Sequence, residues 1–262
     1  MEARLKAPVK APVEAALEGP AAGPESGGLD KTGGSIREMF AGVAPRYDLL
    51  NRLLSARRDV AWRRQAAAAL ALPADSLVLD LCCGTGDQAL AAGNEGYRVV
   101  AADFCLPMLA LARRKYAAAG GEGPLGAGAD SLRLPFADET FDGATASFGL
   151  RNLADLDAGL REIARVLKPR GRVAFLEAAV PRNVLRRPYL WYFTVVLPRI
   201  GRRLSPCGSA YAYLPASVLD FPQRDDFVTL LARAGLAPGR WRDLSAGAVC
   251  LYTAQRERRR AS

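Results

Sequence analysis

The spacing of apolar residues changes several times along this 262-residue chain, and each change marks an expected element. Ile36, Phe40 and Val43 recur at the spacing of one helix face. Ser35 stands just before them and is expected to cap that helix. A further helix is predicted over residues 63–70. Both helices precede the regular alternation of strands and helices that follows.

Beyond residue 70 the pattern alternates between short apolar runs and amphipathic segments. The expected strands are Leu77–Leu81, Arg98–Ala102, Phe141–Ser147 and Arg172–Glu177. The expected helices are Asp87–Asn94, Pro107–Ala118 and Asp155–Leu167. Such alternation predicts an α/β fold, with a parallel sheet covered by helices on both faces. A closing hairpin is expected over Leu236–Trp241 and Ala246–Thr253.

The two ends of the chain differ from this pattern. Residues 1–34 are rich in Ala, Pro, Gly and Glu without any hydrophobic period, which predicts a disordered extension. One domain is then expected over residues 35–256, followed by a basic tail over residues 257–262.

Composition narrows the chemistry. The formal net charge is +9, which favours anionic partners, and the chain contains no histidine. A histidine base or a histidine metal ligand is therefore excluded. The five cysteines form no C-x-x-C pair, so they predict reduced thiols and no metal site. No apolar run is long enough to span a bilayer and no secretory segment is visible, so a cytoplasmic protein is expected.

The stretch "VLDLCCGTGD" (residues 78–87) predicts a strand that breaks into a tight glycine turn. Gly84 and Gly86 lack a Cβ atom, so the backbone there can adopt positive φ and approach a ligand. With Ala89 they match the loose G-x-G-x-x-A pattern of dinucleotide-binding proteins. The match alone leaves a dinucleotide, another ligand and a purely structural turn open.

Asp103 ends the second expected strand, in "RVVAAD". A carboxylate at this place can accept hydrogen bonds from ribose hydroxyls. Both a dinucleotide and S-adenosylmethionine carry a ribose, so Asp103 does not separate them. It can also cap the helix expected from Pro107 onward.

The order of further motifs does distinguish S-adenosylmethionine from a dinucleotide. "GADSLRLPFADETFD", "FGLRN" and "LREIARVLKPRGRVAFLE" follow the glycine turn in sequence, and together they resemble the class I S-adenosylmethionine-dependent methyltransferases. The resemblance implies a Rossmann-like three-layer sandwich. Its sheet would be seven-stranded and mostly parallel, with an antiparallel C-terminal hairpin strand and N-terminal lid helices. The residues then implied to contact S-adenosylmethionine are Gly84, Thr85, Gly86, Asp103, Asp130, Ser131 and Ser147. Ser147 could instead be a small residue that packs under the loop.

Four stretches narrow the resemblance further: "VAPRYDLLNRLLS", "SFGLRNL", "LPRIG" and "YAYLPASVLDFP". They are similar to the demethylmenaquinone and ubiquinone-biosynthesis C-methyltransferase family over about residues 36–254. The family transfers a methyl group to a ring carbon of a polyprenylated quinol. Three departures from its pattern stand out: the chain has no histidine, Arg170 replaces a glycine, and the Ser-Lys that follows Glu177 in the family is lost.

The resemblance implies that Arg151 and Asn152 face the quinol. Because guanidinium stays protonated, Arg151 is expected to stabilise a phenolate or orient a water, not to act as a base. Asn152 would hold that water or a ring oxygen. Tyr47, Tyr211 and Tyr213 are candidate walls of the substrate pocket. Arg151 could instead be an exposed arginine at a helix entry, and the tyrosines could be structural.

The segment over residues 185–222 is the expected lid or membrane-surface insertion. In "LRRPYLWYFTVVLPRIGRRL" an aromatic run is flanked by arginines. The arginines could contact anionic headgroups while the aromatic residues lie at the membrane interface, or the segment could form a lid over the pocket. Peripheral contact with the membrane is therefore expected as an alternative to a lid. Nucleic acid is not expected, because the aromatic and basic residues are not interleaved. The oligomeric state stays open.

Two other functions remain open at this point. One is a methyltransferase of the same fold that acts on another lipophilic small molecule. The other is a non-enzymatic membrane or nucleic-acid binder that kept the fold, which would have no affinity for the cofactor.

Overall fold

A computed structural model describes residues 31–44, 47–119, 123–196, 199 and 208–258. Its centre is a seven-stranded sheet in the order β3-β2-β1-β4-β5-β7-β6. The strands are β1 (Leu77–Leu81), β2 (Arg98–Asp103), β3 (Leu125–Gly128), β4 (Phe141–Ser147), β5 (Leu167–Ala178), β6 (Arg240–Leu244) and β7 (Val249–Gln255). Only β7 runs against its neighbours, β5 and β6, while the other pairs are parallel. The predicted fold class is confirmed.

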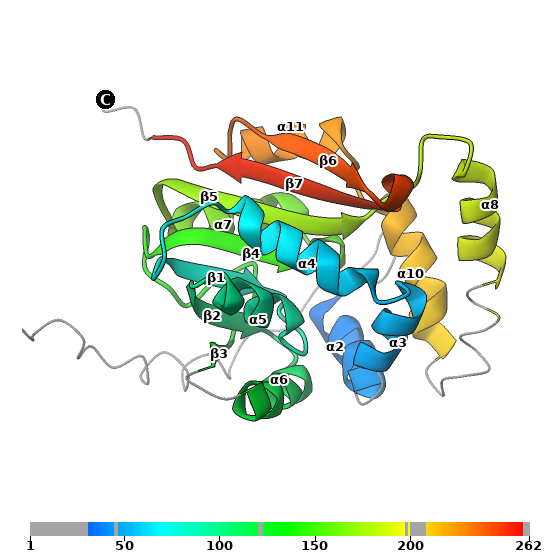
Figure 1. Cartoon of the computed structure of the whole chain (residues 1–262), viewed down its shortest axis with the longest axis horizontal. Helices are drawn as coiled ribbons and strands as arrows, with labels where there is room; N and C mark the ends of the chain where they lie inside the picture. The colour runs from blue at the N-terminus through cyan, green and yellow to red at the C-terminus, as the bar shows by residue number, and fades with distance from the viewer. Residues whose placement is uncertain (1–30, 45–46, 120–122, 197–198, 200–207, 259–262) are drawn as a thin grey trace, which may run out of the picture.

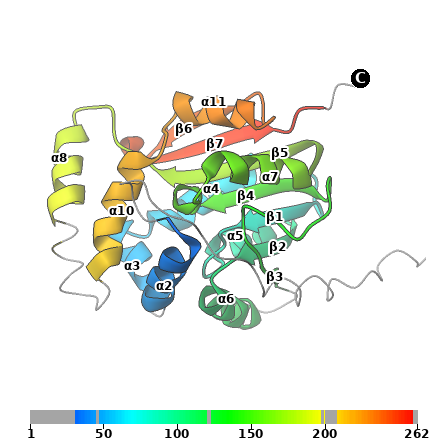
Figure 2. The ribbon, with the colours of Figure 1, turned by 180° about the vertical axis from the view of Figure 1, so that it is seen from behind.

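Helices cover both faces of this sheet (Figures 1 and 2). The helices on one face are α4 (Arg58–Ala69), α5 (Asp87–Asn94) and α6 (Leu106–Ala119), and those on the other are α7 (Leu156–Val166) and α11 (Asp225–Arg233). Successive strand residues point to opposite faces. Val78 and Leu251 therefore pack with the first group, and Leu79 and Tyr252 pack with the second.

The remaining helices gather at the carboxyl ends of the parallel strands (Figure 1). They are α2 (Gly33–Val43), α3 (Tyr47–Leu54), η3 (Leu150–Asn152), α8 (Arg186–Trp191), the π-helical turn η4 (Tyr192–Val196), α10 (Gly208–Asp220) and η5 (Ser245–Gly247). Helix α10 belongs to the segment over residues 185–222 and contacts η4 of the same segment. It also contacts α2 and η3, so it joins this segment to the N-terminal helix α2 and to the turn after β4.

Several element boundaries differ from the sequence prediction. Helix α2 begins at Gly33, which places Ser35 inside the first turn and not at the cap. The short strand β3 and helix α11 were not predicted. Strand β3 has the sequence LGAG, without the β-branched residues that mark a strand, and it forms because β2 offers a parallel edge.

The closing hairpin is shifted toward the C-terminus. Its first strand begins at Arg240 and not at Leu236, because Pro238 has no N–H to donate to a neighbouring strand. Leu236 forms a single bridge to Arg256 instead. Residues 1–30 and 259–262, which include most of the predicted extension and most of the predicted basic tail, lie outside the described residues.

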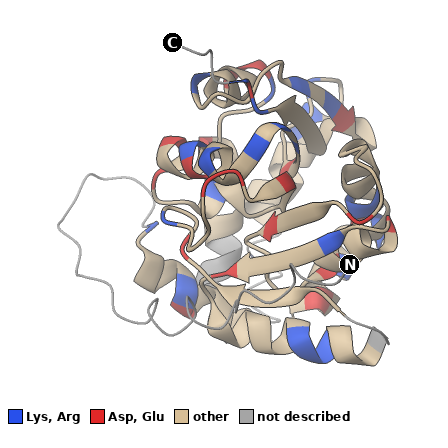
Figure 3. Cartoon of the chain, turned by 90° about the vertical axis from the view of Figure 1, so that its left-hand side faces the viewer, with Lys and Arg blue, Asp and Glu red and all other residues tan. Residues whose placement is uncertain are grey.

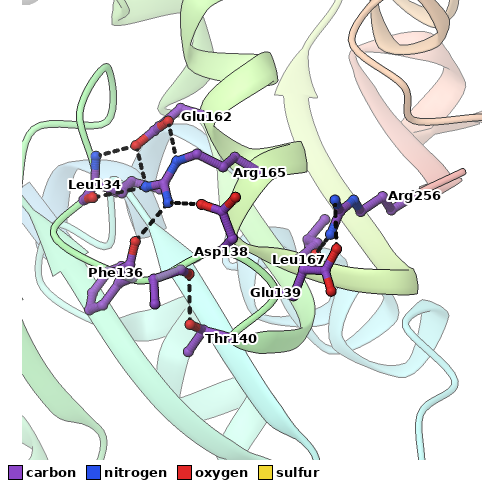
Figure 4. Close-up of polar contacts among 10 residues, drawn as sticks. Leu134, Phe136, Asp138, Glu139, Thr140, Glu162, Arg165, Leu167 and Arg256 are labelled. Atoms are coloured by element: carbon purple, nitrogen blue, oxygen red, sulfur yellow. Dashed lines mark hydrogen bonds and ion pairs between the residues drawn. The ribbon is translucent and has the colours of Figure 1, made fainter. Parts of the chain in front are cut away.

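Polar contacts fix the loop between β3 and β4 against α7 (Figure 4). Arg165 donates to both oxygens of Glu162, to Asp138 and to the carbonyls of Leu134 and Phe136. Glu162 also accepts the N–H of Leu134 at 2.8 Å. One arginine therefore satisfies several loop groups that form no regular secondary structure.

Charge on the side opposite α8 and α10 is mixed in sign. Lys and Arg alternate with Asp and Glu over the ribbon there (Figure 3). The net charge of +9 is thus not gathered into a basic patch on this side.

Candidate functional site

The order of the sheet places the site. Strand β1 lies between β2 and β4, so the chain reverses its winding direction there. In open α/β sheets, ligands bind at this switch point, beyond the carboxyl ends of the strands. The carboxyl ends of β1, β2 and β4 and the loops that follow them carry seven of the twelve predicted site residues: Gly84, Thr85, Gly86, Asp103, Ser147, Arg151 and Asn152.

Two glycines make the turn after β1 possible. Gly84 has φ 54° and Gly86 has φ 84°, a region that favours glycine. At Gly86 space is also lacking, because an added Cβ would lie 2.1 Å from the hydroxyl of Tyr116. Tyr116 is buried on α6, so the turn is pressed against that helix. The sequence predicted the turn but not this contact.

Asp103 ties the glycine turn to the loop after β2. Its carboxylate accepts the N–H of Gly84 and the N–H of Cys105, each at 2.8 Å. Burial raises the pKa of Asp103, although these backbone donors act against that rise. Asp103 is thus in the predicted place, and its bond to Cys105 supports the start of α6 as well. Contact with a ribose stays a prediction.

Asp80 adds a buried carboxyl group directly before the turn. Its side chain is fully buried, and within the described ranges no hydrogen bond of good geometry reaches either oxygen, although the backbone N–H of Ala89 lies near enough to lower its pKa. Burial raises the pKa of Asp80 well above its usual value; the charge of Arg63 acts against this rise, and the nearby Asp103 adds to it. Two carboxyl groups in a buried space favour a cationic group as their neighbour. The residues present therefore fit a sulfonium cofactor.

Helix α3 closes over the turn from the outside. The hydroxyl of Thr85 donates to Asp48, and Lys115 pairs with Asp48 at 2.7 Å and with Asp87. Burial acts to raise the pKa of Asp48, yet the hydrogen bonds from Lys115 and Thr85 lower it overall. Tyr47 lies beside the same turn, 3.9 Å from a Cβ placed on Gly84. Tyr47 is therefore next to the predicted cofactor residues.

The loop after β3 carries Asp130 and Ser131. Asp130 is exposed and accepts the N–H of Leu132, while Ser131 is buried with its hydroxyl 3.6 Å from the sulfur of Cys82. The loop after β3 thus meets the loop after β1. Burial raises the pKa of the Cys82 thiol to about 12, which favours the neutral thiol over the thiolate near pH 7.

Ser147, the last residue of β4, is buried, and its hydroxyl donates to Gln88 at 2.8 Å. Gln88 in turn donates to the carbonyl of Arg63. The side chain of Ser147 therefore points into a polar chain between β4, α5 and α4. This agrees with the alternative in which it packs under the loop, and its contact with the cofactor stays a prediction.

Arg151 is buried and paired, so the alternative of an exposed helix-entry arginine is wrong. Its Nη1 donates to Glu177 at 2.9 Å and to the carbonyl of Phe148. The Nε atom is buried without a hydrogen-bond partner in the described part of the chain. Nη1 carries two hydrogens and both are used, so the edge formed by Nε and Nη2 is the one left for a ligand.

Asn152 and the C-terminal helices complete the site. The hydroxyl of Tyr213 donates to Asn152 at 3.1 Å, which brings α10 against η3. Tyr211 lies on α10 as well, but its side chain is outside the described residues. The sequence missed Tyr189, whose ring stacks on that of Phe193 with the ring centres 5.2 Å apart. Tyr189 lies near enough to Arg151 for the guanidinium charge to act to lower its pKa. Burial nonetheless raises the pKa of Tyr189 to about 12.

Two residues with positive φ flank this arrangement: Cys82 at 50° and Phe148 at 62°. Such backbone conformations cost about 1–3 kcal/mol each and cluster at functional sites. They bring the two loops into contact, because a Cβ placed on Gly149 would lie 2.3 Å from the Cβ of Cys82. Glycine at 149 therefore allows the loop after β4 to approach the loop after β1. Among the described residues, no cluster of side chains could hold a metal ion.

Comparison with known proteins identifies the family. The sequence model of the ubiE/COQ5 methyltransferase family matches residues 29–256. The chain belongs to this family. It is 42% identical to the ubiquinone/menaquinone biosynthesis C-methyltransferase of Geobacter sulfurreducens, over 87% of the chain and 91% of that protein. It is 40% identical to the demethylmenaquinone methyltransferase of Thermobifida fusca, over 88% of the chain and 98% of that protein.

Solved structures support the fold of this methyltransferase. A SAM-dependent methyltransferase from Thermotoga maritima aligns with a TM-score of 0.62 at 18% identity, covering 84% of the chain and 99% of that structure. At this identity the likeness concerns the fold alone. The non-enzymatic alternative is therefore wrong on the evidence of the family, because the family is one of methyltransferases.

The glycine turn yields a stability prediction. Gly86→Ala should lower the free energy of unfolding by more than about 1 kcal/mol, because alanine tolerates neither the positive φ nor the contact with Tyr116. Gly93→Ala in α5 is the matched control, since nothing lies within 4 Å of its added Cβ. That change should stabilise the helix slightly. Denaturant unfolding measures both, and equal stability of the two variants would contradict the argument.

Proposed function

We propose that this methyltransferase transfers the methyl group of S-adenosylmethionine to a ring carbon of a polyprenylated quinol. The observation that carries the proposal is the buried Arg151 after β4, whose Nε has no hydrogen-bond partner among the described residues while its Nη1 is held by Glu177. Both relatives described above are named for menaquinone or demethylmenaquinone. A demethylated naphthoquinol is therefore the first substrate to test.

The cofactor would be held by the loops after β1, β2 and β3. Gly84 and Gly86 bring backbone close to it, Asp103 offers its free lone pairs to the ribose, and Asp130 and Ser131 flank the adenine. S-adenosylmethionine supplies an electrophilic methyl group when it is bound. The role of the chain is then to hold the accepting carbon in line with that group, which is the main source of rate in such a reaction.

The quinol ring becomes nucleophilic when a hydroxyl group loses its proton. Arg151 cannot take that proton, but its Nε and Nη2 donors can stabilise the phenolate that remains. Because Arg151 is buried, this stabilisation is stronger than it would be in water. Asn152, held by Tyr213, would orient a ring oxygen or a water that receives the proton. Once the ring carbon has taken the methyl group, the same carbon would lose its hydrogen to water as a proton and the ring oxygen would regain one, which restores the aromatic quinol.

The reaction itself is tested by product analysis. The enzyme is incubated with methyl-labelled S-adenosylmethionine and a panel of demethylated naphthoquinols, benzoquinols and unrelated lipophilic phenols, each with and without a prenyl tail. We expect label on a ring carbon of a prenylated quinol, assigned by mass and by NMR of the product. Label on oxygen, or only on the unrelated phenols, would reject quinol C-methylation in favour of another acceptor.

Arg151→Lys tests the role of the guanidinium. Lysine keeps the charge but has all its donors on one nitrogen, so it cannot hold Glu177 and Phe148 and also present a flat two-donor edge to a phenolate. We expect kcat to fall about 10²–10³-fold, as for loss of an oxyanion donor. Arg151 is expected to face the quinol and not the cofactor. The affinity for S-adenosylmethionine, measured by calorimetry, should therefore change by less than about twofold, which is less than about 0.5 kcal/mol.

Arg165→Lys is the matched control, since Arg165 is also paired with a glutamate but lies in the loop network of Figure 4. It should lower thermal stability and leave kcat near that of the wild type. A wild-type kcat in Arg151→Lys would remove the guanidinium from the mechanism.

We also propose that residues 184–196, which contain α8 and η4 and are called the α8 segment below, rest on an anionic membrane surface. Val184 is 91% exposed, Trp191 63% and Leu185 47%, and Arg186 and Arg187 are exposed beside them. The inner side of the same segment is packed, with Phe193 buried against Val218 of α10. The segment can therefore cover the site on one side and meet lipid on the other. Within the described ranges, no helix has the length and apolar character to cross a bilayer.

Vesicle co-sedimentation tests the membrane contact. The wild type should bind phosphatidylglycerol vesicles and bind phosphatidylcholine vesicles more weakly. The double change Arg186→Gln/Arg187→Gln should weaken binding to the anionic vesicles roughly tenfold or more, at about 1 kcal/mol per arginine. Arg98→Gln/Arg240→Gln removes the same charge at exposed positions where β2 and β6 begin. Equal losses in the two double variants would show that net charge, not the α8 segment, governs binding.

A further inference from the structure

We infer that Glu177 is a positioning residue for the methyl transfer, and that it sets which edge of the Arg151 guanidinium faces the quinol. This inference rests on the proposed function, since it concerns the same arginine. Glu177 is fully buried near the end of β5. Among the described residues it forms hydrogen bonds with Arg151 and with none of the predicted cofactor residues.

Glu177 holds Arg151 at two points. One carboxylate oxygen accepts Nη1 at 2.9 Å, and the other accepts the backbone N–H of Arg151 at 3.3 Å. The carboxylate therefore fixes the side chain and the backbone of the same residue. The carbonyl of Phe148 accepts the second hydrogen of Nη1. Rotation of the guanidinium would break both side-chain bonds, so Nε and Nη2 keep one orientation.

The clamp is built on a rigid element. Glu177 pairs in register with Cys250 of β7, and its neighbour Leu176 pairs with Ser147 of β4. The carboxylate is therefore placed by the central sheet, whereas Arg151 lies in the short η3 turn. Sites supported by strands are held more accurately than sites supported by loops. Glu177 transmits that accuracy to Arg151.

Glutamine cannot reproduce this arrangement. Both oxygens of Glu177 face an N–H donor, whereas a glutamine side chain offers one acceptor and one donor. In Glu177→Gln, the amide NH₂ must point at Nη1 or at the backbone N–H of Arg151. The variant thus keeps the size of the side chain and breaks one of the two contacts. It also leaves the buried guanidinium without its counter-charge.

The experiment compares Glu177→Gln with the wild type on the prenylated naphthoquinol. We expect kcat to fall about 10–100-fold, the range for a reacting group displaced by about 1 Å. The affinity for S-adenosylmethionine by calorimetry should be unchanged. Glu177→Asp, which keeps both oxygens and the charge, should fold and show an intermediate loss of kcat.

A spectroscopic measurement separates positioning from mere stability. A bound naphthol is titrated, and its absorbance reports the pKa of its hydroxyl on the enzyme. The wild type should lower that pKa by presenting Nε and Nη2 to the naphtholate, and Glu177→Gln should lower it less. A purely structural role for Glu177 would leave the pKa of the bound naphthol as in the wild type.

Glu162→Gln is the matched control, because Glu162 also accepts an arginine and a backbone N–H, those of Arg165 and Leu134. It should reduce thermal stability without changing kcat or the naphthol titration. Wild-type kcat in either Glu177 variant, or an equal fall of kcat in Glu162→Gln, would overturn the inference. If the wild type itself labels no quinol, the proposed function fails instead, so the two failures are distinguishable.

Discussion

The structure depends on carboxylates that are buried at the carboxyl edge of the sheet and must be satisfied by backbone N–H groups of the loops. Asp103 accepts two such bonds, from Gly84 and Cys105, and thereby joins the loops after β1 and β2. Glu177 does the same for the loop after β4 through the N–H of Arg151. Since an unpaired buried carboxylate is costly, these bonds select one conformation for loops that otherwise lack regular structure.

The same buried groups divide the site electrostatically. Asp80 and Asp103 lie buried by the glycine turn, and burial raises the pKa of both carboxyl groups. Arg151 lies beyond β4, and its Nε has no hydrogen-bond partner in the part of the chain that the structure describes. A cationic methyl donor and a phenolate acceptor suit these two parts respectively. The proposed mechanism uses this division of charge and needs no histidine, which the chain lacks.

The helices around this edge belong to two distant parts of the sequence. Asp48 of α3 bonds the glycine turn through Thr85, and Tyr213 of α10 bonds Asn152 of η3. The N-terminal and C-terminal parts of the chain thus each contact one half of the site. The turn η4 packs Phe193 inward against α10, while the preceding helix α8 leaves Trp191 exposed, so a lid and a surface for lipid are compatible roles.

The sequence by itself determined the fold and its family. Strands β1 and β4 and helix α5 have the predicted bounds, because apolar runs and glycine turns act over a few neighbouring residues. Arg170 at a usual glycine position indeed has positive φ, at 68°. The sequence also selected Asp103 for the site from its place at the end of a strand, and it selected Arg151 and Asn152 through a resemblance.

Tertiary structure decided what those residues touch. That Glu177 clamps Arg151, that Tyr116 presses on Gly86 and that Tyr189 lies near Arg151 could not be read from spacing. Each contact joins elements far apart in the chain, and no local pattern encodes such a distance. Strand β3 likewise exists because β2 offers it an edge. Local propensity therefore set the elements, and packing between distant elements set the chemistry of the site.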